Sequence, residues 1–107
     1  MPLRDDRQML EHATEAVSLV EGKSKDQVES DRVLSLALVR LLEVIGEAAS
    51  RVSIEFRHES PQIPWQQIIG MRNRLIHAYD AVDTDIVWQI LTDDLPDLVA
   101  ELRKLSS

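Results

Sequence analysis

Cysteine is absent from the 107-residue chain, and aromatic residues and glycine are scarce. Without cysteine there can be no disulfide, no thiolate zinc site and no thiol nucleophile. Aromatic residues make up 4% of the sequence, so any core is built from aliphatic side chains. Three glycines and four prolines exclude a collagen-like or low-complexity polymer. The length fits one domain, covering residues 1–107, and leaves no room for two.

Long hydrophobic runs are also missing. The longest apolar stretch, Val33 to Ile45, is interrupted by a serine, an arginine and a glutamate, whereas a membrane helix needs about 20 apolar residues. The N-terminus, Met1-Pro2-Leu3-Arg4, opens no apolar segment of the kind that a secretory signal needs. We therefore expect a soluble cytoplasmic protein that does not interact with membranes.

Basic residues are outnumbered by acidic ones: the sequence has 12 Lys and Arg and 19 Asp and Glu, which gives a net charge of −7. A uniformly acidic surface repels nucleic acid, so non-specific phosphate binding is excluded as a main activity. The charge is uneven, however. Residues 50–79 carry four arginines and only two acids, whereas residues 80–101 carry seven acids and no cation. A phosphate-handling site, if there is one, is therefore expected in residues 50–79.

Apolar residues recur at three- and four-residue spacing along the chain, which is typical of amphipathic helices. Leu10, Ala13, Val17 and Val20 predict a first helix over residues 4–21, ended by Gly22. A second helix is predicted over residues 31–56. It is apolar around most of its circumference, and its polar residues Arg40, Glu43 and Glu47 share one stripe. Such a helix needs neighbours on several sides, either within the bundle or in a second subunit.

Proline divides the second half of the chain. Pro61 and Pro64 exclude one continuous helix, and Pro64 suits the first position of a third helix over residues 64–79. A final helical region is expected over residues 85–105, where Pro96 should introduce a kink or a division. Strand-like alternation is absent from the sequence. The fold class predicted is an all-α, up-and-down bundle of four or five helices.

The third predicted helix carries an unusual polar cluster. At 100° per residue, Arg72 falls within an arc of isoleucines, and an unpaired guanidinium in such a place would be costly. Glu47, on the polar stripe of the second helix, is the expected partner. Asn73 and His77 are i,i+4 neighbours on the adjacent flank.

These residues have structural interpretations too. An arginine in an apolar arc is often part of an ion pair that holds helices in register, His77 is compatible with a packing role, and Tyr79 with a place at the rim of the core. The three histidines lie far apart and lack the spacing of metal ligands, so no metal or other cofactor is predicted. The residues by themselves indicate a helical bundle with a polar cluster on its third helix.

The segment Arg72-Asn73-Arg74-Leu75-Ile76-His77-Ala78-Tyr79 resembles the R-N-x-x-x-H-x-Y motif of HEPN-superfamily ribonucleases. More narrowly, it is similar to the HepT-like toxins of bacterial HepT/MNT toxin–antitoxin pairs. The similarity extends over nearly the whole chain and includes Ile45-Gly46-Glu47-Ala48, Ile63-Pro64-Trp65, Gly70-Met71, and Val82-Asp83 before Val87-Trp88.

This resemblance implies a HEPN-like homodimer in which the two motif helices meet near the two-fold axis. It implies a type VII-like toxin, an endoribonuclease that cleaves tRNA or mRNA without a metal ion through an R-x4-H motif. His77 would then transfer a proton, Arg72 would stabilise transition-state charge and Asn73 would position the phosphate. Glu47 would support them as an orienting residue.

The resemblance also implies a second protein, a minimal nucleotidyltransferase (MNT) antitoxin. This partner would neutralise the toxin by transferring AMP from ATP to Tyr79, which places a bulky negative charge beside Arg72. Two alternatives stay open: a non-catalytic helical binding or regulatory partner of a nucleotidyltransferase, and a structural dimerisation bundle held by a buried Arg–Glu pair.

Overall fold

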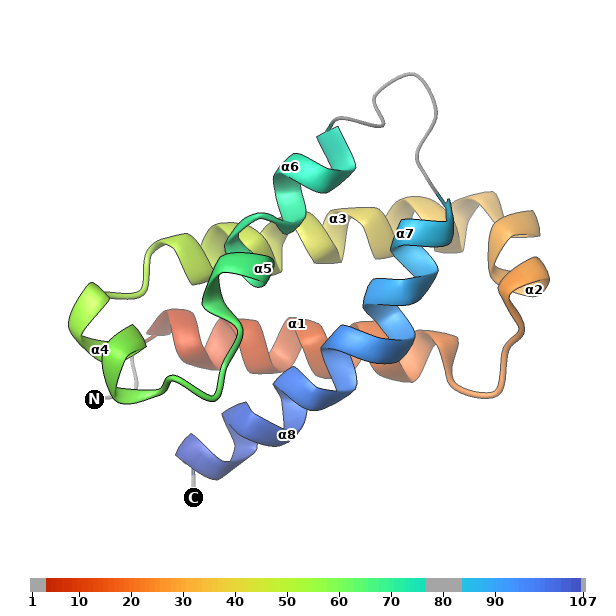
Figure 1. Cartoon of the computed structure of the whole chain (residues 1–107). Helices are drawn as coiled ribbons and strands as arrows, with labels where there is room; N and C mark the ends of the chain where they lie inside the picture. The colour runs from red at the N-terminus through yellow and green to blue at the C-terminus, as the bar shows by residue number, and fades with distance from the viewer. Residues whose placement is uncertain (1–3, 77–83, 107) are drawn as a thin grey trace.

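Two long helices, α1 (Arg4–Val20) and α3 (Arg32–Ser50), lie side by side and form the frame of the fold (Figure 1). The computed structural model describes residues 4–76 and 84–106. α1 agrees with the helix predicted over residues 4–21. It presents a row of small and flexible side chains to its neighbours, because Met9, Ala13 and Ala16 are fully buried at three- and four-residue spacing.

A short helix, α2 (Lys25–Ser30), joins the two long helices. Gly22 ends α1 with a φ of 76°, a left-handed conformation that residues with a Cβ adopt rarely. Ser24 and Gln27 then form a reciprocal capping box, in which each side chain accepts the backbone N–H of the other residue. The carboxylate of Asp31 accepts the backbone N–H of Leu34 at 3.0 Å and so begins α3.

The helix predicted over residues 31–56 is interrupted, so its predicted end at residue 56 was wrong. α3 ends at Ser50, and a separate helix, α4 (Ile54–Glu59), begins after Ser53, whose hydroxyl accepts the N–H of Phe56 at 3.1 Å. Arg57 Nη2 donates to the carbonyls of Ala49 and Ser50 at 3.4 and 3.0 Å, which satisfies the end of α3. The apolar pattern continues across the break because Val52 and Phe56 are both buried.

The helix predicted over residues 64–79 is also divided. α5 (Trp65–Ile69) and α6 (Met71–Ile76) are separated by Gly70, whose N–H still bonds to Gln66 O at 2.9 Å. A Cβ at position 70 would lie 3.0 Å from that same carbonyl oxygen, a closer approach than side chains normally make. The end of the predicted helix, residues 77–79, lies outside the described residues.

The C-terminal helical region is divided near Pro96, as predicted. The division is a segment of wider, π-helical turns, and not a loop. α7 (Thr84–Gln89) leads into a π-helical segment, η1 (Ile90–Asp94), and then into α8 (Leu95–Ser106). Leu95 N–H donates to Ile90 O, five residues back, in place of the usual four. Proline lacks an N–H and its ring crowds the carbonyl four residues earlier, so a locally widened helix accommodates Pro96 without ending the helical path.

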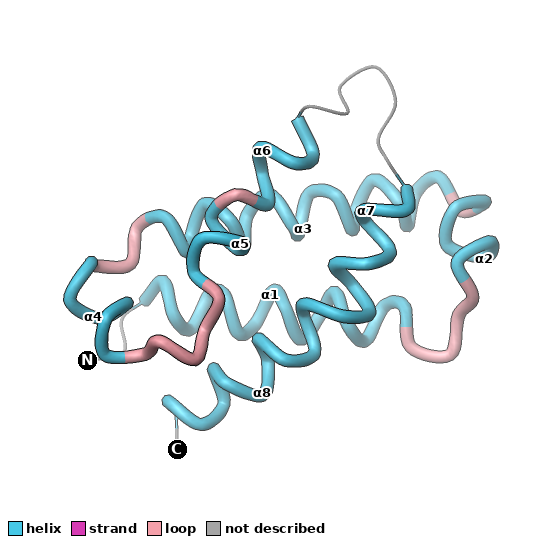
Figure 2. Tube along the Cα trace, viewed as in Figure 1, coloured by secondary structure: helices cyan, strands magenta, loops and turns pink. Residues whose placement is uncertain are grey.

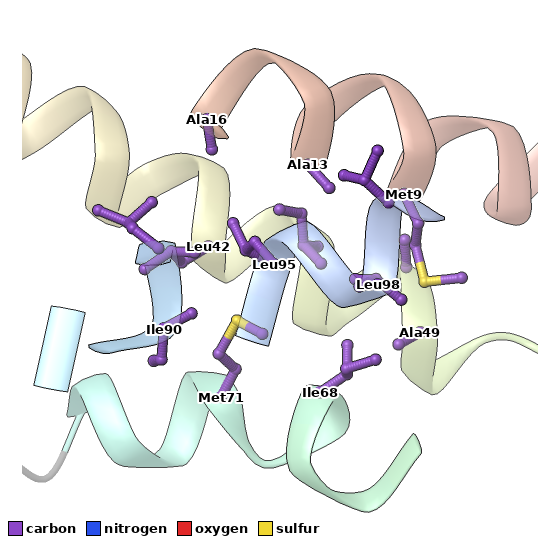
Figure 3. Close-up of a cluster of buried hydrophobic side chains, with 14 of the residues drawn as sticks. Met9, Ala13, Ala16, Leu42, Ala49, Ile68, Met71, Ile90, Leu95 and Leu98 are labelled. Carbon is purple, nitrogen blue, oxygen red and sulfur yellow. The ribbon is translucent and has the colours of Figure 1, made fainter. Parts of the chain in front are cut away.

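The core lies where α8 and η1 pack across α1, and α5 and α6 pack on α3 (Figures 1 and 2). Leu95 and Leu98 of α8 lie between the alanines of α1 and the side chains of Ile68 and Met71 (Figure 3). The predicted all-α class is confirmed, and the described residues contain no strand (Figure 2). Among the same residues, no helix is both long and apolar enough to cross a membrane.

Candidate active site

Two residues predicted to belong to the site, Glu47 of α3 and Asn73 of α6, line one groove. Gly46, Ser50 and Ile69 complete its walls, and its volume is about 230 Å³. Glu47 and Asn73 are 26 positions apart in sequence, and they meet because α6 packs against α3. The structure therefore brings together a carboxylate and an amide that the sequence assigned to neighbouring helices.

Asn73 faces outward because α6 is fixed to the core by the residues on its other face. Met71 and Leu75 are four positions apart and are 1% and 6% exposed, respectively. At 100° per residue, Asn73 points away from both of them, and its side chain is exposed. The backbone of Arg72 is helical within α6.

Glu47 makes an ion pair that sequence analysis did not predict. Its carboxylate lies 3.3 Å from Arg51 Nη1, one turn further along, and both side chains are about half exposed, at 50% and 49%. A pair this exposed is expected to contribute little to stability. The predicted pairing of Glu47 with Arg72 stays a prediction, because the side chain of Arg72 lies outside the described part of the structure. His77 and Tyr79 also lie outside it.

A second groove lies on the other flank of α5 and α6. Arg74 Nη1 is 3.6 Å from the carboxylate of Asp94 in η1, so an ion pair connects the motif helix to the π-helical segment. Gln66, Gln67, Gly70 and Gln89 line the same groove. The sequence does not predict this pair, because a separation of 20 residues carries no periodic signal that would join Arg74 to Asp94.

The whole chain can be compared with known proteins. A family model described as "Ribonuclease HepT-like" matches residues 9–105. The chain belongs to the HepT-like family. The "Probable ribonuclease HepT" of Thermococcus cleftensis is 34% identical over 106 residues, which are 95% of this chain and 96% of that protein. A protein of Caldanaerobacter subterraneus subsp. tengcongensis named "Putative RNase" is 35% identical over 107 residues, which cover 96% of each chain.

A third relative of this HepT-like chain, also named "Putative RNase", comes from Methanocaldococcus jannaschii. It is 31% identical over 95 residues, which are 89% of this chain and 87% of the relative. No solved structure is significantly similar to the chain. The family match covers every element that builds the groove between α3 and α6, so it concerns the whole helical fold and not the motif alone.

The described residues of this HepT-like protein contain no group of three histidine or acidic side chains that could hold a metal ion. The groove contains the amide of Asn73, on the helix that also carries Arg72, and beside it the carboxylate of Glu47 on α3. An amide can donate to a phosphate oxygen, and a carboxylate can accept from a guanidinium or an imidazole and fix its orientation. Both groups can therefore position charged or polar partners, whereas neither an amide nor an ionised carboxylate paired with arginine is suited to donate a proton.

Proposed function

We propose that this protein is an endoribonuclease toxin that cleaves tRNA or mRNA without a metal ion. The observation that carries the proposal is the match of residues 9–105 to a ribonuclease family, together with relatives named as ribonucleases along nearly their full length. The exposed position of Asn73 supports it, because this residue of the R-N-x-x-x-H motif lines one groove with Glu47 of α3.

The reaction is an internal transfer at phosphorus. The 2′-hydroxyl of the RNA loses its proton, and its oxygen bonds to the adjacent phosphorus while the bond from phosphorus to the 5′-oxygen breaks. The products are a 2′,3′-cyclic phosphate and a 5′-hydroxyl end, so no external nucleophile is consumed. His77 transfers protons near neutral pH, and Arg72 holds the phosphate and stabilises the charge that develops on it. Asn73 positions a phosphate oxygen, and Glu47 orients the cationic groups.

Two copies of the chain are needed in this mechanism, because Arg72 and His77 are about 140° apart on an ideal helix and diverge within one copy. The outward stripe of α3 supports such a homodimer. Val33 and Leu36 are 78% and 57% exposed, and both lie on the side of α3 that also carries Arg40 and Glu47. Exposed apolar side chains on the same helix face as Glu47 fit a second copy related by two-fold symmetry.

Activity is regulated, in this proposal, by an MNT nucleotidyltransferase antitoxin that transfers AMP to Tyr79. The phosphate of the adenylate would bring negative charge next to the phosphate-binding residues and would repel RNA. Mass spectrometry after incubation with such an enzyme and ATP should find one adenylate on Tyr79. An adenylate at another residue, or none, would contradict this part of the proposal.

The experiment that tests the nuclease is a cleavage assay on total tRNA and on mRNA in the presence of EDTA. The wild-type protein should cleave, and His77→Ala should lose about 10²–10⁴-fold in rate, the usual contribution of a general acid–base residue. His58→Ala is the matched control, because His58 is an exposed histidine on α4. Equal cleavage by His77→Ala would remove His77 from the mechanism. A wild-type protein that cleaves no RNA would favour the non-catalytic partner.

A further inference from the structure

The groove on the far flank of α5 and α6 combines one cation, one anion and three amides. Arg74 and Asp94 are 35% and 30% exposed, so both reach solvent, and the groove holds about 380 Å³. Gln66, Gln67 and Gln89 are exposed, and their side chains make no hydrogen bond with any described residue. The surface is therefore rich in donors and acceptors that no described part of the protein uses.

The ion pair in this groove is loose. At 3.6 Å, the closest approach of Arg74 to Asp94 exceeds the roughly 2.7–2.9 Å of a charge-assisted hydrogen bond. A guanidinium has five N–H donors and a carboxylate accepts about four hydrogen bonds, so each group keeps most of its capacity for a third molecule. A ligand that pairs with both groups presents hydrogen-bond acceptors to Arg74 and, next to them, hydrogen-bond donors to Asp94.

Guanine presents this arrangement on its Hoogsteen edge and the adjacent Watson–Crick edge. Its N7 and O6 accept hydrogen bonds, as in the common arginine–guanine contact, and its N1–H and N2–H groups beside O6 donate. We propose that the groove is a guanine-binding subsite in which Arg74 donates to O6 and N7 while Asp94 accepts from N1–H and N2–H. Adenine presents an amino donor where guanine has O6, so it would oppose the guanidinium. Uracil and cytosine lack the adjacent pair of acceptors and pair of donors.

The subsite lies next to the site of cleavage. Arg74 directly follows Asn73 in α6, so one helix presents Asn73 to the groove with Glu47 and Arg74 to the groove with Asp94. The assignment of this base to the substrate rests on the proposed ribonuclease function. It specifies that function further: the substrate is single-stranded RNA with a guanine close to the cleaved phosphate, because only an unpaired base exposes these edges.

The test measures binding and cleavage of short single-stranded oligonucleotides that carry one guanine. Binding is measured with 2′-deoxy versions, which cannot be cleaved by attack of a 2′-hydroxyl. The guanine is replaced by adenine, by inosine, which lacks the N2 amino group, or by 7-deazaguanine, which lacks N7. The wild-type protein should prefer guanine over adenine by about tenfold or more, in the range of one good bidentate contact. Removing either N2 or N7 should weaken binding several-fold.

Variants assign each contact to its residue. Asp94→Asn should bind guanine and inosine equally, and Arg74→Gln should bind guanine and 7-deazaguanine equally. The exchange Arg74→Asp with Asp94→Arg keeps an ion pair in the groove but reverses donor and acceptor, so thermal stability should be retained while the guanine preference is lost. Asp93→Asn is the control, since Asp93 is an exposed acid in the same π-helical segment and does not line the groove.

Two results would overturn the subsite: equal affinity of the wild-type protein for all four bases, or variants that weaken every oligonucleotide equally while the exchange restores binding. The second result would assign Arg74 and Asp94 a purely positioning role for α6. Failure of the ribonuclease proposal looks different, because the protein would then bind guanine-containing oligonucleotides selectively without cleaving their ribose versions.

Discussion

Met71→Ala should lower the free energy of unfolding of the domain substantially, whereas Asn73→Ala, in the same helix, should leave it nearly unchanged. α6 has six residues, and isolated helices shorter than about 12–15 residues are marginal in water. It is therefore helical because Met71 and Leu75 are buried against the core, with Met71 only 1% exposed and directed toward α8 (Figure 3). Removing that side chain leaves a cavity that backbone movement fills only in part.

The expected cost follows from this burial. Truncating a buried methionine to alanine costs about 2–5 kcal/mol, and a domain of this size has about 5–15 kcal/mol in total. For a loss of about 3 kcal/mol, the midpoint of thermal unfolding should fall by roughly 12–24 °C in a domain of about 100 residues. Asn73→Ala should change the unfolding free energy by no more than about 0.5 kcal/mol, because its side chain is exposed.

Thermal unfolding followed by circular dichroism measures both variants, and RNA cleavage is measured beside it. Met71→Ala should lose activity together with stability, whereas Asn73→Ala should lose activity with an unchanged midpoint. A midpoint lowered by more than about 5 °C in Asn73→Ala would refute the reasoning, since it would make Asn73 a structural residue. An unchanged midpoint in Met71→Ala would show that α6 does not depend on its buried face.

Two further predictions concern other surfaces. Leu36→Asp should convert the proposed dimer to a monomer in light scattering, because it places a charge on the apolar half of the α3 stripe. A Gln62→Asp control should stay dimeric, and a dimeric Leu36→Asp would exclude this face as the interface. Lys25→Met should lower the unfolding midpoint at neutral pH. The hydrogen bond of Lys25 to Asp85, with the charges of Asp85 and Glu29, raises the pKa of Lys25 above its ordinary value of 10.5. That stabilisation is present below pH 10.5 and is lost as the pH rises through the folded-state pKa, so the difference between variant and wild type should vanish at strongly alkaline pH. A difference that is constant into that range would show that the ion pair does not contribute.

Periodicity and capping chemistry predicted the elements whose determinants are local. The extent of α1 and its end at Gly22 depend on residues within a few positions of one another. The breaks in the longer predicted helices were missed for the opposite reason. Val52 and Phe56 continue the apolar pattern into the core, so spacing cannot show that Ser53 starts a new helix. At Gly70, the separation of α5 from α6 depends on the close approach of a backbone carbonyl.

For the candidate site, too, the sequence predicted local features and not the contacts between helices. The exposed stripe of α3 and the outward position of Asn73 follow from helical periodicity, so the sequence could assign Glu47 and Asn73 to accessible faces. That the two faces share one groove is a property of how α6 packs on α3, and spacing along the sequence does not show it. The ion pair of Arg74 with Asp94 was not predicted, because its partners are 20 residues apart and meet only through the packing of the helices. The i,i+4 pair of Glu47 with Arg51 was not predicted either, because Glu47 was assigned to Arg72.

The net charge of −7 constrains how such a ribonuclease can select RNA. Phosphate contacts provide most of the affinity of non-specific nucleic-acid binding, and an acidic surface weakens them at long range. The arginines of residues 50–79 supply few such contacts, and Arg57 is already engaged with the carbonyls that end α3. Affinity for RNA must then come to a larger extent from contacts with bases, which depend on sequence and little on salt. An acidic toxin with one local cationic helix is therefore expected to be a selective nuclease, and the polar groove beside Arg74 is where that selection can be made.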